Sequence, residues 1–373
     1  MSEKISIKAF HGISGFSSLL PVWQQLLEHV PAYEFIHHPA WHHALQQWIL
    51  KDQVSYVLVE NDGRALAIVP LVIRKHPSLT PGHYDIHSPQ HDHIALSDWI
   101  LSADADMRVL TPLMPDIVSS LGVESWGKFV MEGVPDTSPV VQLHDGLHKP
   151  ADGESQGFLC TQACTQYSAW FSCDEGDQPV AAKMRRNLRR LKSQAGEVGP
   201  VEMETVSDPV GLSAAFDKFL DVEACGWKGE GGSAIEQDEV LSGFYRDMLS
   251  GRFPGIRAKI NLLWIGDQVA AVQYILETPS CTSILKIGYR EDFGKFSPGS
   301  LLLRELLDTS LANPQTKKVS LVTSPLWAER WHPNKQAVYT CTIYNNTTRG
   351  KALRGLDGLK AIARSTYREF TER

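Results

Sequence analysis

The stretch TSILKIGYREDFGKFSPGSLLLRELLDTSL, residues 282–311, predicts a strand, a short loop and a helix. Residues 282–289 are rich in β-branched and aromatic side chains and have the length of a strand. Residues 290–296 are charged and contain a glycine, which is typical of a loop. Ser297 suits the N-cap of a helix, and Pro298 suits its first position, where the N–H that proline lacks would have no partner.

The start of this helix is a candidate anion site. The first turn of a helix has N–H groups without intrahelical partners, and the helix dipole adds partial positive charge there. A phosphate would meet Ser297, Pro298, Gly299 and Ser300, and Gly299 would let it approach the backbone closely. The alternative is a well-capped helix without a ligand, and spacing alone does not decide between the two.

Composition is typical of a protein with a packed core. The chain has 373 residues, enough for two domains, with 43% hydrophobic and 21% charged residues. The net charge of −7 offers no global attraction to nucleic acid. The six cysteines are scattered without a second close pair, which favours free thiols in a reducing compartment over a zinc site. No signal-like start and no long apolar run occur, so we expect a cytoplasmic protein without a membrane span.

Histidines gather at two places. His37, His38, His42 and His43 fall around the start of a predicted helix, and residues 87–93 contain three more. Structural zinc sites usually pair cysteine and histidine more tightly. We therefore expect packed or solvated histidines and no bound metal.

The chain predicts two domains, residues 1–165 and 166–373. Residues 149–156 are rich in Pro, Gly, Asp and Ser, as linkers are. Residues 56–73 and 261–276 each read as an apolar strand, a turn with Asp, and a return strand, which indicates two domains on one plan. In the second copy, predicted strands at 258–265, 268–277 and 282–289 form an antiparallel meander.

Two further segments suggest ligand contacts. Residues 183–192, KMRRNLRRLK, predict an amphipathic helix with six positive charges. Its partner would be a polyphosphate, an RNA backbone or the protein's own acidic surface, and the alternative is a solvated helix face without a partner. A predicted helix at 211–224 leads into the glycine-rich loop 226–233. Trp227 and Lys228 in that loop are candidate substrate contacts, because mobile loops often cover substrates.

The segments RRNLRRLKSQAG (185–196), IGDQVAAVQY (265–274) and ILKIGYREDFGKFSPGSLLL (284–303) together resemble the GNAT superfamily. Within it they resemble the CelD-type acetyltransferase-like proteins linked to cellulose and exopolysaccharide synthesis. FIHHPAWHHALQQW (35–48) extends the likeness into the first half. The resemblance covers most of the chain, although no single motif carries it.

This resemblance implies an α/β fold of two tandem GNAT-like domains, each with a mixed, mainly antiparallel sheet flanked by helices, similar in plan to Fem-type aminoacyl transferases. It implies acetyl-CoA or another acyl-CoA as donor, with its pyrophosphate at the Ser297–Ser300 helix start of the C-terminal domain. The first copy of the repeat has no matching Ser-Pro-Gly, so we expect no donor site in the N-terminal domain. The family's Gln/Arg-x-x-Gly-x-Gly/Ala signature is absent. The family's Gly-Asp-x-x-Tyr-Lys-x-x-Trp run is replaced by TSPLWAERW at 323–331, which keeps the last Trp.

The predicted reaction is N-acyl transfer to an amine on a small molecule, sugar or peptide. Such chemistry needs a proton acceptor for the amine, a polarised carbonyl and an acid for the thiolate. We expect Glu223, or alternatively Glu277, to accept the proton and Tyr289 to protonate the thiolate. Lys286 would pair with phosphate, and strand N–H groups at 286–288 would polarise the carbonyl. Trp327 and Trp331 are candidate acceptor contacts.

Two other functions remain open from the sequence. An aminoacyl-tRNA could replace acyl-CoA, with the basic helix 183–192 meeting RNA, although the net charge makes nucleic acid a less favoured partner. Alternatively, the altered 323–331 stretch could indicate a non-catalytic scaffold or regulator on the same fold.

Overall fold

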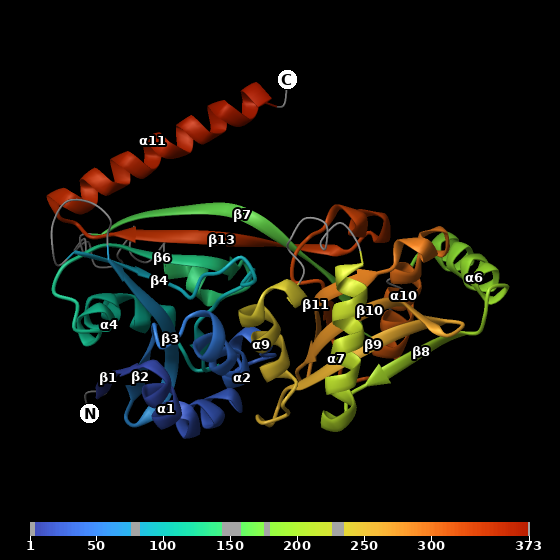
Figure 1. Ribbon diagram of the computed structural model, residues 1–373. Coiled ribbons are helices and arrows are strands. Elements are labelled where there is room, and N and C mark those ends of the chain that lie inside the picture. The colour runs from blue at the N-terminus through green and yellow to red at the C-terminus, as the bar shows by residue number, and fades with distance from the viewer. Residues whose placement is uncertain (1–3, 76–82, 144–157, 175–179, 226–234, 372–373) are drawn as a thin grey trace. The chain divides into compact units, whose positions relative to one another are not determined.

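The computed structural model describes residues 4–75, 83–143, 158–174, 180–225 and 235–371, the last eleven of these as helix backbone. The chain divides into two compact units (Figure 1). Unit 1 contains Met1–Val30, Asp52–Gln166 and Ala337–Arg373, and unit 2 contains Pro31–Lys51 and Tyr167–Gln336. The sequence suggests the contiguous domains 1–165 and 166–373. In the structure, residues 31–51 belong instead to unit 2, and residues 337–373 belong to unit 1.

Unit 1 is built on a mostly antiparallel sheet. Its strand order is β1-β2-β3-β4-β6-β13-β7, with β5 on β3, and β4 and β6 form its parallel pair. The predicted hairpin forms between β2 and β3, because Asp62 and Gly63 both adopt the positive φ that a tight hairpin turn requires. The elements are β1 (Ile5–His11), α1 (Gly12–Leu27), β2 (Val54–Asn61), β3 (Arg64–Lys75), β4 (Tyr84–His87), β5 (Ile100–Leu101), α3 (Met107–Leu110), α4 (Met114–Ser120), β6 (Trp126–Pro135), β13 (Asn334–Tyr344) and α11 (Thr348–Thr371), with 3-10 turns at Thr111–Leu113 and Pro139–Gln142.

Unit 2 has the strand order β7-β12-β11-β10-β9-β8. All neighbours are antiparallel except β11 and β12. The elements are α2 (Pro39–Ala44), a π-helix at Leu45–Ile49, β7 (Leu159–Ser172, shared with unit 1), α6 (Ala182–Gly196), β8 (Val201–Val206), α7 (Pro209–Ala224), α9 (Glu239–Met248), β9 (Arg257–Ile265), β10 (Gln268–Glu277), β11 (Cys281–Tyr289), α10 (Pro298–Ala312) and β12 (Lys318–Ser320), with 3-10 turns at Phe35–His37, Ile235–Gln237, Glu291–Phe296 and Leu326–Trp331.

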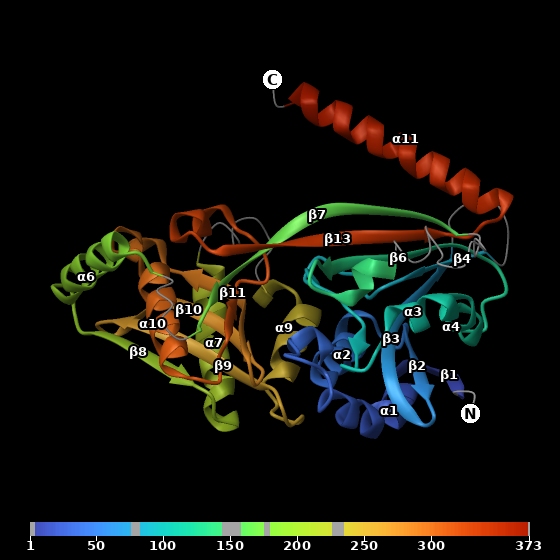
Figure 2. The ribbon, with the colours of Figure 1, turned by 180° about the vertical axis from the view of Figure 1, so that it is seen from behind.

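Helices cover both faces of the unit 2 sheet (Figures 1 and 2). Ala271 and Ile275 of β10 pack in one core with leucines of α6 and α10. Tyr274, which points the other way along the same strand, packs against Phe216 of α7 and Tyr245 of α9. The predicted meander, the basic helix and the helix after residue 297 are therefore present, and the mixed α/β fold with a mainly antiparallel sheet flanked by helices is confirmed.

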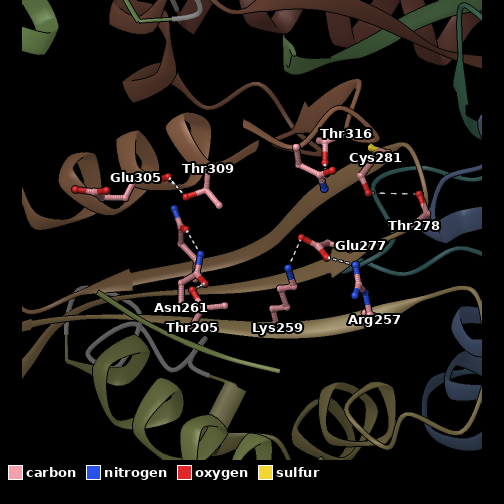
Figure 3. A network of polar contacts seen from close by, with 12 residues as sticks. Thr205, Arg257, Lys259, Asn261, Glu277, Thr278, Cys281, Glu305, Thr309 and Thr316 are labelled. Carbon is pink, nitrogen blue, oxygen red and sulfur yellow. Dashed lines mark hydrogen bonds and ion pairs between the residues drawn. The ribbon is translucent and has the colours of Figure 1, made fainter. Parts of the chain in front are cut away.

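Polar side chains tie the β9–β10 hairpin together (Figure 3). Lys259 and Arg257 both contact the Glu277 carboxylate, at 2.7 and 3.4 Å. On the same ladder the Asn261 amide donates to Gln273, at 3.2 Å. Glu277 is thus held in ion pairs at the end of β10 that lies opposite Thr282, the far end of β11 from Tyr289.

Residues 31–51 belong to unit 2 because their aromatic side chains pack on α9. The rings of Trp41 and Phe244 meet edge to face at 5.1 Å. Trp48 lies so close to Gly243 that a Cβ there would come within 2.2 Å of its ring. These contacts connect positions about 200 residues apart, which local sequence patterns do not reveal. Among the described residues, no helix combines the length and hydropathy needed to cross a membrane.

Candidate functional site

The strands β11 and β12 separate after three residues. Cys281–Ser283 pair with Lys318–Ser320 in parallel, and the chain beyond Ser320 follows β7 instead, with Leu321 N–H bonded to Ala169 O. On the other side, β10 pairs Tyr274 with Lys286 and Ile275 with Ile284, so Leu285 is an extra residue, a β-bulge. Beyond Ser283, β11 is therefore not paired with β12 in the described part of the chain.

The helix α10 follows β11 after one short turn. A 3-10 turn, Glu291–Phe296, links the end of β11 to Ser297, which adopts a left-handed conformation with φ of 51°. The Ser297 carbonyl accepts from the N–H groups of Ser300 and Leu301, at 2.9 and 3.1 Å. The predicted side-chain cap is wrong, because the Ser297 hydroxyl makes no capping hydrogen bond. Pro298 has no N–H, so Gly299 is the first residue of α10 that offers one.

Open space lies over this first turn. A Cβ added at Gly299 would have no atom within 4 Å. Next to it, the guanidinium of Arg330, from the 3-10 turn Leu326–Trp331, donates a short hydrogen bond to the Ser300 hydroxyl. A fixed cation therefore stands beside the positive end of the α10 dipole. Arg330 was not among the predicted site residues, because nothing in its local sequence shows that it reaches Ser300.

The basic helix α6 packs against the same core as α10. Leu188 and Leu191 are buried in that core, and Lys192 forms an ion pair with Glu305 of α10 at 2.8 Å. Arg186 and Arg189 are exposed. Lys192 thus meets the protein's own acidic surface, which is one of the partners that the sequence predicts for this helix. Arg186 and Arg189 face solvent.

Glu223, Tyr245 and Lys286 come together on the opposite face of β11. Glu223 is 4% exposed at the end of α7, and its carboxylate accepts from Ile235 N–H at 3.0 Å. The Lys286 ammonium lies 5.8 Å from the ring centroid of Tyr245. Burial, and secondly the negative charge of Glu223, raise the pKa of the Tyr245 hydroxyl. A buried carboxylate, a buried phenol and a half-buried amine therefore lie on the same face of β11.

The end of α7 lies directly on β11 at Gly288. A Cβ at this position would meet the backbone Cα of Glu223 at 2.9 Å and its backbone N at 3.1 Å. Only glycine permits this approach, and it sets the depth at which Glu223 sits beside the strand. Tyr245 could not be found from the sequence, because nothing in its local pattern connects the helix α9 to β11.

The structure separates some of the residues that the sequence analysis grouped. Tyr289, 49% exposed, pairs with Ala271 and so projects on the α10 face, whereas Lys286 pairs with Tyr274 and projects on the α7 face. Lys286 is thus not on the side of the α10 start where we expected it to pair with phosphate. Trp227 and Lys228 lie outside the described residues.

The two predicted tryptophan contacts differ in exposure. Trp327 is 39% exposed on the turn that carries Arg330. Trp331 is 4% exposed and packs edge to face on Phe171, with ring centroids 6.5 Å apart. Of the two, Trp327 has a surface that a ligand can contact.

The four histidines near residue 40 have separate partners. His37 accepts at Nδ1 from Glu34 N–H, at 3.0 Å. His38 donates from Nε2 to Pro254 O and accepts at Nδ1 from Ala40 N–H, which requires the neutral ring. His42 bonds to Ile36 O, and His43 to Asp247 at 3.0 Å. Burial lowers the pKa of His38 to about 4 and that of His42 to about 3. Within the described ranges, no three His, Cys, Asp or Glu residues gather as metal ligands do.

Comparison with known proteins identifies the fold around this site. A family model described as "Acetyltransferase (GNAT) domain" matches residues 182–325. These residues lie in unit 2 and include α6, the meander, α10 and β12. No curated protein matches the chain.

Solved structures of similar fold have low sequence identity. The crystal structure of FemX is 10% identical, with a TM-score of 0.58 over 85% of this chain and 94% of FemX. The C-terminal domain of a proposed lysylphosphatidylglycerol synthetase from Agrobacterium fabrum is 11% identical, with a TM-score of 0.53 over 92% of this chain and 96% of that one. L-PGS from Bacillus licheniformis is 12% identical, with a TM-score of 0.52 over 88% and 92%. The chain thus carries the GNAT acetyltransferase-domain fold, which supports a transferase of acyl groups.

Proposed function

We propose that unit 2 is an N-acyltransferase that moves an acyl group, in the first instance acetyl, from acyl-CoA to a primary amine on a small molecule, sugar or peptide. The observation that carries the proposal is the open first turn of α10 with Arg330 beside it, following the strand β11 that β12 leaves after Ser283. The amine of a sugar used in polysaccharide synthesis is one acceptor of this class.

The donor's phosphates fit the start of α10. The open space over Gly299 leaves room for an anion beside the backbone. The Arg330 guanidinium, bonded through one nitrogen to Ser300, keeps other N–H donors for phosphate oxygens. Ser297, Pro298, Gly299 and Ser300 therefore remain the proposed donor contacts, now with Arg330 added.

The edge of β11 that β12 leaves would hold the donor's thioester. Beyond Ser283, β11 is not paired with β12 in the described ranges, so the thioester can lie along this edge with its carbonyl oxygen toward a strand N–H group as negative charge develops on it. The amine nitrogen then bonds to the carbonyl carbon as the carbon–sulfur bond breaks. Tyr289, exposed at the end of the strand, would give its proton to the departing thiolate.

Glu223 is the proposed acceptor of the amine proton. It is buried beside β11, and Glu277, the alternative, is already held by Lys259 and Arg257 at the far end of the sheet. We assign Lys286 to positioning rather than to phosphate binding, because it faces the Tyr245 ring beside Glu223. Trp327 and the Trp227–Lys228 loop are the proposed acceptor contacts.

Mass spectrometry of products tests this proposal directly. Purified protein is incubated with acetyl-CoA and a panel of amino sugars, amino acids and short peptides, and acetylated amines are measured against time. Glu223→Gln should reduce kcat by about 100-fold or more, since general-base catalysis contributes roughly 10²–10⁴-fold. The matched Glu277→Gln variant should retain activity. Equal activity of Glu223→Gln and wild type would refute the assignment of Glu223.

A second candidate function replaces acyl-CoA with an aminoacyl-tRNA. The exposed arginines of α6 and the fold shared with FemX favour it. RNA binding through these arginines would weaken steeply with salt. A chain that transfers no acyl group from CoA but transfers an amino acid from charged tRNA would support this function over the first. A chain that binds neither donor would fit a non-catalytic scaffold.

A further inference from the structure

The described side chains of helix α11 anchor it to unit 1 near its beginning. Leu353 is buried against Gly127, where a Cβ would come within 2.6 Å of the leucine. One turn on, Asp357 accepts from Lys128 at 2.8 Å and from the Tyr344 hydroxyl at 3.3 Å. From there the helix continues to Thr371, away from the strands β6 and β13 (Figures 1 and 2).

An apolar row runs along this helix. Leu356 and Leu359, three residues apart, are 53% and 66% exposed. The sequence continues the same three- and four-residue spacing with Ala363, Tyr367 and Phe370. Such spacing places apolar positions on one face of a helix. The two exposed leucines, together with the spacing that the sequence continues, mark a candidate contact surface.

The helix is also strongly basic. Its 24 residues include six Lys or Arg and two Asp or Glu, in a chain whose net charge is −7. Lys351 and Arg354 are exposed and form no ion pair with another described residue. Basic charge combined with an apolar row is the pattern of helices that lie on anionic membranes.

A groove joins the two kinds of surface. It has a volume of about 620 Å³ and is lined by Leu159, Lys351, Arg354, Gly355, Gly358 and Leu359. Cβ atoms at Gly355 and Gly358 would have no neighbour within 4 Å, so no packing in the described structure explains these glycines, although glycine weakens a helix. Their effect is to keep the groove open between the cations and the leucines.

We propose that α11 docks on a bilayer surface that contains anionic phospholipids. A lipid phosphate would lie in the groove between Lys351 and Arg354, and Leu356 and Leu359 would enter the boundary between headgroups and acyl chains. A bilayer supplies negative charge and apolar contact along the whole length of the helix. Pairing of α11 with a second copy would instead bring two basic helices together, which like charges oppose. This docking is independent of acyl transfer.

Vesicle flotation with the full chain tests the proposal. We expect the protein to float with vesicles of 70% phosphatidylcholine and 30% phosphatidylglycerol and to remain behind with pure phosphatidylcholine. Raising NaCl from 50 to 500 mM should weaken the binding, because salt screens the charges. This comparison uses the unmodified protein, so it does not depend on the folding of a variant.

Two pairs of substitutions separate the charge from the apolar row. Lys351→Gln with Arg354→Gln should lower the partition constant about 30-fold, since each basic residue near such a surface contributes roughly a factor of five. Leu356→Gln with Leu359→Gln should lower it about 100-fold. The matched control is Arg64→Gln with Lys75→Gln, two exposed cations at the ends of β3, which should leave the partition constant unchanged.

Several outcomes would overturn the proposal. Equal flotation with neutral and anionic vesicles would show that charge does not drive the binding. If the control pair lowered the partition constant as much as the α11 pairs do, α11 would not be the binding surface. Absence of flotation at 50 mM NaCl would exclude a membrane. If light scattering then showed a dimer that the Leu356→Gln and Leu359→Gln pair abolished, the apolar row would be an interface between copies. Retention by an acidic protein without flotation would equally contradict docking on lipid.

Discussion

Replacing Gly288 with alanine should destabilise unit 2 and displace the proposed base. The new Cβ would stand 2.9 Å from the Glu223 Cα and 3.1 Å from its N, and both are backbone atoms. No side-chain rotation relieves such contacts, so α7 must shift relative to β11. Overpacking of this kind costs roughly 1–3 kcal/mol of unfolding free energy.

Thermal unfolding followed by circular dichroism measures this loss. A change of 1 kcal/mol corresponds to about 2–4 °C in the Tm of a unit of this size, so Gly288→Ala should lower the Tm of the unit 2 transition by about 2–12 °C. Gly299→Ala is the matched control. Its Cβ meets nothing within 4 Å, so it should leave the Tm unchanged or raise it slightly, because alanine favours a helix over glycine.

The same variant also tests the site. If Glu223 accepts the amine proton, Gly288→Ala should reduce kcat below wild type at temperatures where the variant is fully folded. A variant as stable as wild type would show that α7 does not rest on β11 at this glycine. A variant that is less stable but equally active would refute the role of Glu223 in proton transfer while leaving the packing argument intact.

Three further predictions follow from single features. Arg330→Met should weaken acetyl-CoA binding in calorimetry by about tenfold or more, since a hydrogen bond to a charged group contributes roughly 1.5–3 kcal/mol. Arg330→Lys should restore part of the lost affinity. Unchanged affinity in Arg330→Met would show that Arg330 is not in the donor site. Burial lowers the pKa of His38 to about 4 and that of His42 to about 3, so protonation favours the unfolded chain as the pH falls below 6.5. Urea unfolding should therefore show that unit 2 loses about 2 kcal/mol of unfolding free energy per histidine between pH 7 and pH 5. The His42→Gln variant should lose less, and a stability that does not change with pH would contradict this prediction. Arg186→Gln with Arg190→Gln should leave acetyl-CoA binding unchanged but weaken any tRNA binding in gel shifts, and a loss of both would place α6 in the donor site.

Local patterns predicted much of unit 2. The alternation in residues 258–289 gave the meander, and the Ser-Pro-Gly at 297–299 marked where α10 begins. These signals are contained in short windows, and the backbone follows them. The same pattern failed for the Ser297 cap, because the link from the preceding 3-10 turn holds this residue at positive φ and directs its carbonyl, rather than its hydroxyl, to the helix.

Contacts between residues far apart in the sequence decide which side chains meet at the site. Arg330 reaches Ser300 across 30 residues, and Tyr245 joins Glu223 and Lys286 from a third element. The assignment of residues 31–51 to unit 2 depends on Trp41 and Trp48 meeting α9. Periodicity states which face of an element is apolar but not which other element covers it, so these meetings could not be read from the sequence.

The most direct test of the proposed function is calorimetric titration of acetyl-CoA into the wild-type chain and into Gly299→Leu. The leucine would occupy the open space over the first turn of α10, where its Cβ meets no atom within 4 Å. Gly196→Leu, at the end of α6 where a Cβ also has no neighbour, is the control. We predict saturable binding by wild type and Gly196→Leu and at least a 100-fold weaker affinity for Gly299→Leu, the loss of about two hydrogen bonds to charged phosphate. Equal binding by all three folded proteins would place the donor elsewhere, and no binding by the wild type would contradict the acyl-CoA donor.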